Sequence, residues 1–281
     1  MSQPLVTVIC LCHNHERFVR EAVESVYRQS YSRVQLIIVD DCSQDQSVAL
    51  IKELIRDRPE IVFIVNDKNI GNCKSFNLAL TVAQGEFIID LAADDILLPE
   101  RIATGVGTLQ KAGIEYGVQF SDAEIVSEKG GRLYLHSDKY PHHTIPQGDI
   151  YRELIDRFFI CSPTMMFRME VMEHMNGYDE SLAFEDFDFW IRSSRKFKYC
   201  YVPQVLEKKR LVNSSMSQRQ FTRGNHQRWS TLAVCKKIKA LNRNLEEDKA
   251  LQRRLRYEFL LSMRMMDVSL AMQFLKLWVR K

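Results

Sequence analysis

Two adjacent carboxylates, Asp94 and Asp95, follow an apolar run over residues 86–92 that predicts a buried strand, and a helix is predicted over 99–112. Two acidic side chains at the end of a buried strand are costly unless a cation meets them. Mg²⁺ or Mn²⁺ would suit, because these ions take one or two carboxylates together with substrate phosphates and water. The alternative is that both acids only stabilise the start of the next helix, by about 0.3–1 kcal/mol each. The spacing alone leaves both interpretations open.

A second acidic pair, Glu185 and Asp186, lies in the aromatic-rich stretch LAFEDFDFWIRSS, residues 182–194. The pattern predicts a helix whose acidic first turn points toward a cleft. A carboxylate in that place could accept the proton of a substrate hydroxyl, which is the work of a general base. The alternative is again a helix start stabilised by acids. The aromatic side chains are expected to pack in the core rather than to bind sugars.

The elements that must position these acids alternate along the first 112 residues. Apolar runs predict strands at 6–12, 34–40, 61–66 and 86–92, and helical periodicity predicts helices at 16–29, 47–58, 73–83 and 99–112. Strands and helices in this order form βαβ units and a mostly parallel sheet. The strand runs are apolar throughout, which indicates strands covered on both faces. The predicted fold class is therefore an open α/β sheet flanked by helices.

Polar residues follow each of the four strands, at positions 13–15, 40–43, 66–71 and 94–95. Open parallel sheets bind ligands outside the carboxyl ends of their strands, so these residues are expected to converge. Neither glycine-rich phosphate loop, G-x-G-x-x-G or G-x-x-x-x-G-K-[S/T], occurs in the chain. A ligand with a sugar and phosphates would therefore need a divalent cation at this edge.

The rest of the first 222 residues is less regular. A strand pair is predicted at 116–126 and 132–136. A loop at 138–149 carries His142 and His143, which are expected to be solvated, with contacts to an acceptor as the alternative. A helix at 151–159, a strand at 162–168 and a short helix at 171–175 complete this part.

Charge is unevenly distributed over the 281 residues, whose net charge is +3. Residues 224–281 hold thirteen Lys or Arg against five Asp or Glu, a net charge of +8, which leaves −5 for the rest. Helices are predicted there at 229–240, 249–262 and 263–278. A basic helical region favours peripheral contact with an anionic membrane, to which each basic residue contributes about 1 kcal/mol. The alternative is that these helices pack on the rest of the chain or on a second copy in a homodimer.

The seven cysteines are scattered, and Cys10 and Cys12 lie beside two histidines. One residue between paired cysteines is too few for a structural zinc site. No secretory signal precedes the first strand, and no apolar run reaches about 18 residues. A reduced, cytoplasmic compartment is therefore expected.

Four segments together resemble the inverting GT-A glycosyltransferases of family 2. They are VTVICLCHNHERFVREAVESVYRQSY, VQLIIVDDCSQDQS, NIGNCKSFNLALTVAQGEFIIDLAADD and SPTMMFRMEVMEHMNGYDESLAFEDFDFWIR. The resemblance runs from about Leu5 to Ser217, and its strength lies in the order and spacing of the segments. It implies a GT-A catalytic domain over 1–222, with a nucleotide-sugar half at 1–112 and an acceptor half at 113–222. Residues 223–281 would form a basic helical appendage.

The resemblance also implies roles for individual residues. The end of the strand at 6–12 and the loop after it would bind the nucleotide sugar. Asp41 would contact the base, Lys74 and Arg210 would lie near the diphosphate, and Asp94 would contact the ribose or the metal. The full set of implied nucleotide-sugar contacts is Cys10, Leu11, Cys12, Asn14, Asp41, Lys74, Asp94 and Arg210. Asp94 and Asp95 would hold Mn²⁺ or Mg²⁺. Asp186 would be the general base, supported by Glu185.

The implied reaction is a single displacement that inverts the anomeric carbon, with the metal stabilising the leaving diphosphate. A UDP-sugar is the favoured donor. The implied acceptor is a lipid-linked glycan or oligosaccharide at the cytoplasmic face of the membrane, as in bacterial surface polysaccharide (O-antigen or capsule) synthesis. No nucleic acid partner is expected, because the basic region lacks a recognisable module or interleaved aromatic residues.

Two positions depart from the family pattern. Ala92 stands where many members carry the first aspartate of D-x-D-D, and Val212 stands where many carry the histidine of Tyr-Arg-x-His. These departures keep open a degenerate fold that acts as a non-catalytic binding subunit, although both acidic pairs are intact. A nucleotidyltransferase is the other alternative, but it usually needs a basic glycine-rich loop after the first strand, where this chain has HNHERF.

Overall fold

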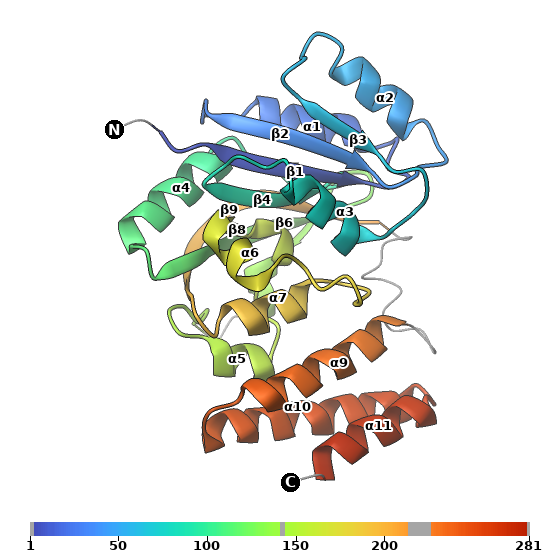
Figure 1. Cartoon of the computed structure of the whole chain (residues 1–281), viewed down its shortest axis with the longest axis vertical. Coiled ribbons are helices and arrows are strands. Elements are labelled where there is room, and N and C mark those ends of the chain that lie inside the picture. Colours follow the sequence, from blue (N-terminus) through green and yellow to red (C-terminus); the bar gives the residue numbers. More distant parts are fainter. Residues whose placement is uncertain (1–2, 141–143, 213–225, 280–281) are drawn as a thin grey trace.

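A computed structural model describes residues 3–140, 144–212 and 226–279. A nine-stranded sheet forms the centre, helices cover both its faces, and three helices from the carboxyl-terminal part of the chain pack below (Figure 1). The histidines at positions 142 and 143 lie outside the described residues.

The strand order is β3-β2-β1-β4-β8-β6-β9-β5, with β7 paired to β6. The strands are β1 Val6–Cys12, β2 Val34–Asp40, β3 Val62–Val65, β4 Phe87–Ala92, β5 Ile96–Leu97, β6 Tyr116–Ser127, β7 Arg132–Leu135, β8 Met166–Arg168 and β9 Lys198–Leu211. The first four strands are parallel, as predicted. The second half is mixed, since β8 runs antiparallel to both β4 and β6 whereas β9 runs parallel to β6.

The helices lie in two layers over the sheet. They are α1 Val19–Tyr27, α2 Ser47–Leu54, α3 Asn72–Leu80, α4 Arg101–Ala112, α5 Tyr151–Asp156, α6 Met169–Met175 and α7 Asp186–Ser193. Alternate residues of β1 face opposite cores: Val8 packs with α1, α2 and α4, whereas Ile9 packs with α3, α6 and α7. This burial on both faces is why the strand runs are continuously apolar.

Strand β9 is the main element that the sequence did not predict. Its fourteen residues include Pro203 and the charged run from Glu207 to Arg210, a composition that propensity assigns to a loop. The strand forms because it pairs along nearly its whole length with β6, in a register that shifts around Asp122. Tertiary pairing therefore overrides local preference here. The predicted strand at 162–168 is also shorter, because Ser162–Thr164 forms a 3₁₀ turn.

The carboxyl-terminal helices are α9 His226–Leu241, α10 Leu245–Arg264 and α11 Val268–Val279. The break between α10 and α11 falls at Met266, which has φ +55°, and not at the predicted position 263. Buried residues of all three helices, among them Ile238, Leu255 and Phe274, belong to the same core cluster as α5 and α7. These helices therefore pack on the rest of the chain. Among the residues that the structure describes, no helix is both long and apolar enough to cross a membrane.

Candidate active site

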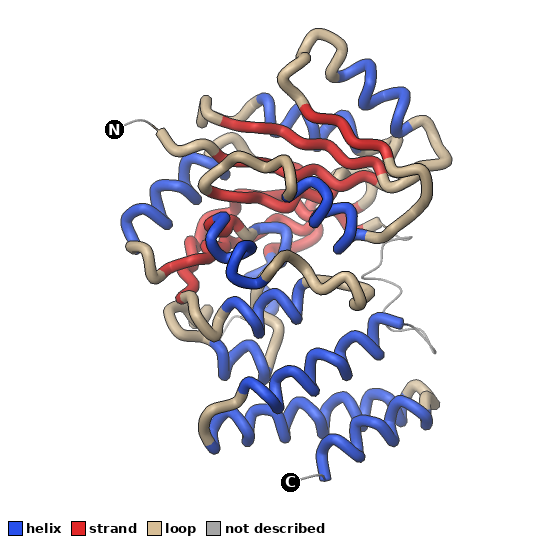
Figure 2. Tube along the Cα trace, in the orientation of Figure 1, coloured by secondary structure: helices blue, strands red, loops and turns tan. Residues whose placement is uncertain are grey.

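The carboxyl ends of β1 to β4 and the loop that leads into α7 lie on the same side of the molecule, where the connecting loops gather (Figures 1 and 2). The register aligns these ends, with Cys12 opposite Asp40 and Leu11 opposite Ala92. The predicted convergence of polar residues on one edge of the sheet is thus a consequence of parallel pairing.

Asp41, one residue beyond β2, closes the loop between β3 and α3. Its carboxylate accepts hydrogen bonds from the backbone N–H of Ile70 at 2.8 Å, from that of Gly71 at 2.8 Å and from the Asn66 amide at 2.9 Å. Gly71 has φ +88°, a left-handed conformation that favours glycine. The carboxylate predicted to meet the nucleotide base is therefore held rigidly by backbone donors.

Asn14 links the loops that follow β1 and β2. Its backbone N–H donates to Ser43 Oγ at 2.8 Å, and its Oδ1 accepts from the backbone N–H of Gln44 at 2.7 Å. A ring nitrogen of His13 lies 2.7 Å from the main-chain oxygen of Asp41. The side chain of Asn14 therefore holds the two loops together. The predicted nucleotide contact would come from the loop that contains Asn14.

The side chains of Cys10, Leu11 and Cys12 point into the two cores and are buried. Burial raises the pKa of the Cys12 thiol to about 12, so this thiol stays protonated. Any nucleotide at this strand end would meet the backbone of these three residues rather than their side chains.

Asp95 is buried below Asp94 at the turn after β4. One carboxylate oxygen of Asp95 accepts from the backbone N–H of Arg210 at 2.8 Å. Burial, and then the negative charge of Asp94, raise the pKa of Asp95 to about 8. Asp94 is partly exposed, and its carboxylate accepts no hydrogen bond from any residue that the structure describes. The pair therefore presents one free and one anchored carboxylate.

Arg210, which is expected to lie near the diphosphate, makes several contacts with other residues of the protein. Its Nε donates to the main-chain oxygen of Asp94 at 3.0 Å, its Nη2 to Glu21 at 2.5 Å, and its Nη1 to the main-chain oxygen of Glu128 at 3.2 Å. Its guanidinium carbon lies 4.9 Å from the centre of the Phe18 ring. Since all these groups belong to the protein, the geometry favours Arg210 as a brace for the Asp94–Asp95 turn.

Lys209 is a site residue that sequence reasoning missed. Burial acts to lower its pKa, but the surrounding Cys161, Asp95, Asp186 and Glu207 raise it above its usual range, so it stays charged. Its positive charge acts on one member of each acidic pair, Asp95 and Asp186. The signal was present in the charged run at 207–210, but it could be interpreted only once β9 placed alternate residues of that run on one face.

The second acidic pair begins α7 and has a third carboxylate beside it. Glu185 accepts from the Asn72 amide at 2.8 Å, and Asp90 accepts from the Tyr178 hydroxyl at 3.1 Å. Burial raises the pKa of Asp90 to about 7, and burial also raises the pKa of Asp186. A carboxylate with a raised pKa is a stronger base, as general-base work requires. Asp90 lies in the strand predicted at 86–92, but it was not identified from the sequence as a candidate site residue.

Lys74 lies on the first turn of α3 and is exposed. It makes no ion pair with the part of the chain that the structure describes, so its ammonium is available to a ligand phosphate.

The residues present fit a divalent ion of the Mg²⁺ or Mn²⁺ type, although they do not enclose it. Within residues 3–140, 144–212 and 226–279, no three His, Cys, Asp or Glu side chains come together as a metal cage. The carboxylate of Asp94 accepts no hydrogen bond from the described residues, and Asp95 has one oxygen left, which together give the one or two carboxylates that such ions use with substrate phosphates.

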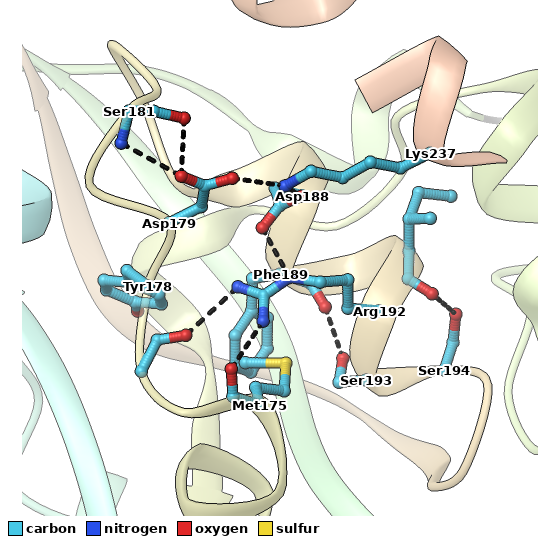
Figure 3. Close-up of polar contacts among 12 residues, drawn as sticks. Met175, Tyr178, Asp179, Ser181, Asp188, Phe189, Arg192, Ser193, Ser194 and Lys237 are labelled. Carbon is cyan, nitrogen blue, oxygen red and sulfur yellow. Dashed lines mark hydrogen bonds and ion pairs between the residues drawn. The ribbon is translucent and has the colours of Figure 1, made fainter. Parts of the chain in front are cut away.

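Helix α9 holds α7 from behind through the network in Figure 3. Asp188, which is 1% exposed, accepts from Lys237 Nζ at 2.5 Å and from Arg192 Nε at 2.6 Å. Lys237 also donates to Asp179 at 2.5 Å. Arg192 donates to the main-chain oxygens of Met175 at 2.8 Å and Gly177 at 3.0 Å. The loop before α7 and the helix itself are therefore tied to the carboxyl-terminal helices.

Comparison with known proteins places this site in context. The model of the family described as "Glycosyl transferase family 2" matches residues 7–175. An uncharacterized glycosyltransferase of Methanocaldococcus jannaschii is 29% identical over 218 residues, which cover 76% of this chain and 73% of that protein. WcaA of Escherichia coli K12, named as a colanic acid biosynthesis glycosyl transferase, is 28% identical over 152 residues, or 54% of this chain and 47% of WcaA.

Two solved structures share the fold. S. aureus TarS 1–349 in complex with UDP-GlcNAc superimposes with a TM-score of 0.67 at 19% identity and covers 90% of this chain and 71% of that one. The mannosyltransferase PcManGT from Pyrobaculum calidifontis, in complex with GDP-Man and Mn²⁺, superimposes with a TM-score of 0.69 at 16% identity and covers 96% of this chain and 74% of that one. The predicted α/β fold of the GT-A type is confirmed.

Proposed function

Because the chain belongs to glycosyl transferase family 2 and is a glycosyltransferase, we propose that it moves a sugar from a nucleotide-diphosphate donor to a hydroxyl of a glycan acceptor with inversion of the anomeric carbon. The observation that carries this proposal is the placement of Asp186, with its raised pKa, in one charged cluster with Asp95 and Lys209. When the base and the diphosphate site belong to one cluster, the base can deprotonate the attacking hydroxyl while the diphosphate site stabilises the leaving group.

The donor would lie along the ends of β1 to β4. Asp41 and the backbone of Cys10, Leu11, Cys12 and the Asn14 loop would hold the nucleotide, and the exposed Lys74 would reach the diphosphate. A UDP-sugar is our favoured donor, supported by the fold shared with TarS, which was solved with UDP-GlcNAc. A GDP-sugar is the second donor to test, because PcManGT was solved with GDP-Man.

Asp94 and Asp95 would hold Mn²⁺ or Mg²⁺ when the donor is bound. The ion would supply positive charge to the leaving diphosphate. Support comes from the free carboxylate of Asp94 and from the Mn²⁺ in PcManGT. Since Ala92 removes a possible third ligand, the positive charge of Lys209 would assist from the protein side.

Asp186 would accept the proton of the acceptor hydroxyl. The acceptor oxygen then forms a bond to C1 of the donor sugar while the bond from C1 to the diphosphate oxygen breaks on the opposite face. The electron pair of that bond leaves with the diphosphate. Glu185, held by Asn72, would keep α7 in register with α3 so that Asp186 faces the reacting hydroxyl.

The acceptor is proposed to be a growing glycan, lipid-linked, in bacterial surface polysaccharide synthesis of the O-antigen or capsule type. The similarity to WcaA, named for colanic acid biosynthesis, supports this assignment. The basic surface of α9 to α11 supports a place at the cytoplasmic face of the membrane.

The deciding experiment is thermal stabilisation of the full chain by UDP, GDP, dTDP and their sugars, with and without Mn²⁺. A ligand bound only by the native state raises stability by RT ln(1 + [L]/Kd). We expect a metal-dependent increase in Tm with one nucleotide. If no nucleotide stabilises the protein with metal present, the non-catalytic binding subunit suggested by Ala92 and Val212 becomes the better account.

A further inference from the structure

A cavity of about 330 Å³ lies between the body of the protein and the carboxyl-terminal helices. From the body, it is lined by Arg157, Phe158 and Phe184, and from α9 and α10 by Arg228, Arg254 and Tyr257. Figure 1 shows α5, which ends beside this cavity, packed directly above α10. The cavity thus exists only because the basic helices pack on the body.

The charge around this cavity is not balanced. Arg228 and Arg254 are each 6% exposed, and both have Glu258 as their nearest carboxylate. The nitrogen–oxygen distances are 3.9 Å to Arg228 and 3.7 Å to Arg254, too long for hydrogen bonds. Among the described residues, two buried guanidinium groups therefore share one carboxylate, which leaves one positive charge without compensation there. Such a buried charge is costly unless a partner meets it.

The remaining groups of the lining increase this excess. The guanidinium of Arg254 lies over the rings of Phe158 at 4.0 Å and Phe187 at 4.9 Å, and its Nε and Nη2 have no hydrogen-bond partner among the described residues. Arg157 makes no ion pair with the described residues. Asp156 also lines the cavity, but both its oxygens are bound by Arg253, at 2.8 and 2.6 Å. An anion is the ligand that this arrangement lacks.

The cavity also adjoins the proposed general base. Phe184 precedes Asp186 by two residues, so their Cα atoms are at most about 7 Å apart. Phe187, on which Arg254 stacks, directly follows Asp186. Tyr257 is 54% exposed, so it offers an aromatic face to which a sugar ring can pack. The cavity is therefore next to the start of α7, the helix that begins at Asp186.

We propose that this cavity anchors an acidic acceptor by an oxyanion, either the carboxylate of an acidic sugar unit or a phosphate attached to the glycan. The inference rests on the proposed glycosyl transfer and specifies its acceptor class as anionic. The arginines supply the charge, the aromatic rings supply apolar contact, and the acceptor hydroxyl lies further along the same chain of sugars, at Asp186.

The test is binding of sodium glucuronate, inorganic phosphate and neutral glucose to the full chain at constant ionic strength, measured by calorimetry. Wild-type protein should bind at least one anion, and glucose about tenfold more weakly or worse. Tighter binding of glucuronate would identify a carboxylated sugar, and tighter binding of phosphate would identify a phosphate group. Equal binding of glucose and both anions, or no anion binding, overturns the proposal.

Variants locate the binding. Arg157→Gln and Arg254→Gln should each weaken anion binding by about tenfold or more. Arg256→Gln is the matched control, because it removes the same charge from an exposed position of α10 that does not line the cavity and makes no ion pair with the described residues. If all three variants weaken binding alike, the effect is non-specific and the proposal is wrong. Arg157 is only partly buried, so Arg157→Gln is expected to fold. This variant therefore still tests the proposal if Arg254→Gln folds poorly.

Thermal stabilisation by nucleotide and Mn²⁺, measured on the same preparations, separates this inference from the proposed function. If the protein binds a nucleotide but no anion, the proposal of an acidic acceptor is wrong and the proposed glycosyl transfer still stands. Anion binding that depends on Arg157 and Arg254 but occurs without any nucleotide response overturns the proposed donor instead.

Discussion

Lys237 of α9 donates a hydrogen bond to Asp188 of α7 at 2.5 Å, and Asp188 lies two residues after the proposed base, Asp186. The two partners are 49 residues apart in the chain. Asp188 is almost fully buried, and Lys237 and Arg192 compensate its negative charge. The carboxyl-terminal helices, which lie outside the region matched by the family model, are thereby part of the support of the reaction site.

Replacing Lys237 by methionine should lower both stability and turnover. Removing one hydrogen bond to a buried charge costs roughly 1.5–3 kcal/mol. Because Lys237 positions α7 and touches no donor residue, kcat should fall while the Kd for nucleotide stays nearly constant. Lys237→Arg should restore much of the turnover. Lys236→Met is the control, since Lys236 is exposed and has no ion pair in the described residues. An equal effect of both methionine variants would contradict this role.

Asp186→Asn should abolish transfer while leaving nucleotide binding intact. Loss of a general base typically costs about 10²–10⁴ in rate. The measurement is product formation with whichever donor stabilises the protein, alongside the Tm with that nucleotide. Glu173→Gln, at an exposed position of α6, controls for the loss of one negative charge. Near-normal turnover in Asp186→Asn would show that another group is the base.

The rate should rise with pH through an acid limb that belongs to Asp186. Since burial raises the pKa of Asp186, the carboxylate that accepts the proton forms only above the usual range of an aspartate, about 3.9. A profile of kcat/KM against pH should therefore show its lower limb displaced to higher pH. A flat profile down to pH 4 would argue against Asp186.

Stability without ligand should fall as pH rises through the titration of Asp90. Its pKa is raised to about 7 in the folded protein, so the folded state binds a proton that the unfolded chain releases near pH 4. The stabilisation is complete below pH 4 and is lost as pH rises through 7, by roughly 1–4 kcal/mol. Asp90→Asn should flatten this dependence, as chemical denaturation at several pH values would measure. An unchanged slope in Asp90→Asn would assign the effect to other groups.

Metal dependence should be carried by Asp94 and Asp95. Asp95→Asn keeps an oxygen that can accept from the backbone N–H of Arg210 but loses the charge, so the fold should persist while Mn²⁺ no longer strengthens nucleotide binding. Chelation of the metal should have the same effect on the wild type. Asp67→Asn, an exposed acid in the loop after β3, is the control. Full metal dependence in Asp95→Asn and also in Asp94→Asn would place the ion elsewhere.

Much of the fold was readable from local pattern. The alternation of apolar runs and helical periods predicted the four parallel strands, and with them that the polar residues after each strand would lie along one edge of the sheet. The family resemblance added the expectation that Asp186 acts as a base, which stays a prediction. These features depend on neighbouring residues in the chain, so the sequence expresses them directly.

The sequence by itself determined the parallel half of the sheet and the two acidic pairs at its edge. Only the tertiary structure decided what stands between them. Strand β9 forms by pairing with β6, some 80 residues away, and this pairing turns the charged run at 207–210 into Lys209 beside the acids and Arg210 behind them. The tertiary structure also decided that the basic helices bury one face against the rest of the chain. Helical periodicity in the sequence shows that a helix has an apolar face, but it does not identify what that face packs against.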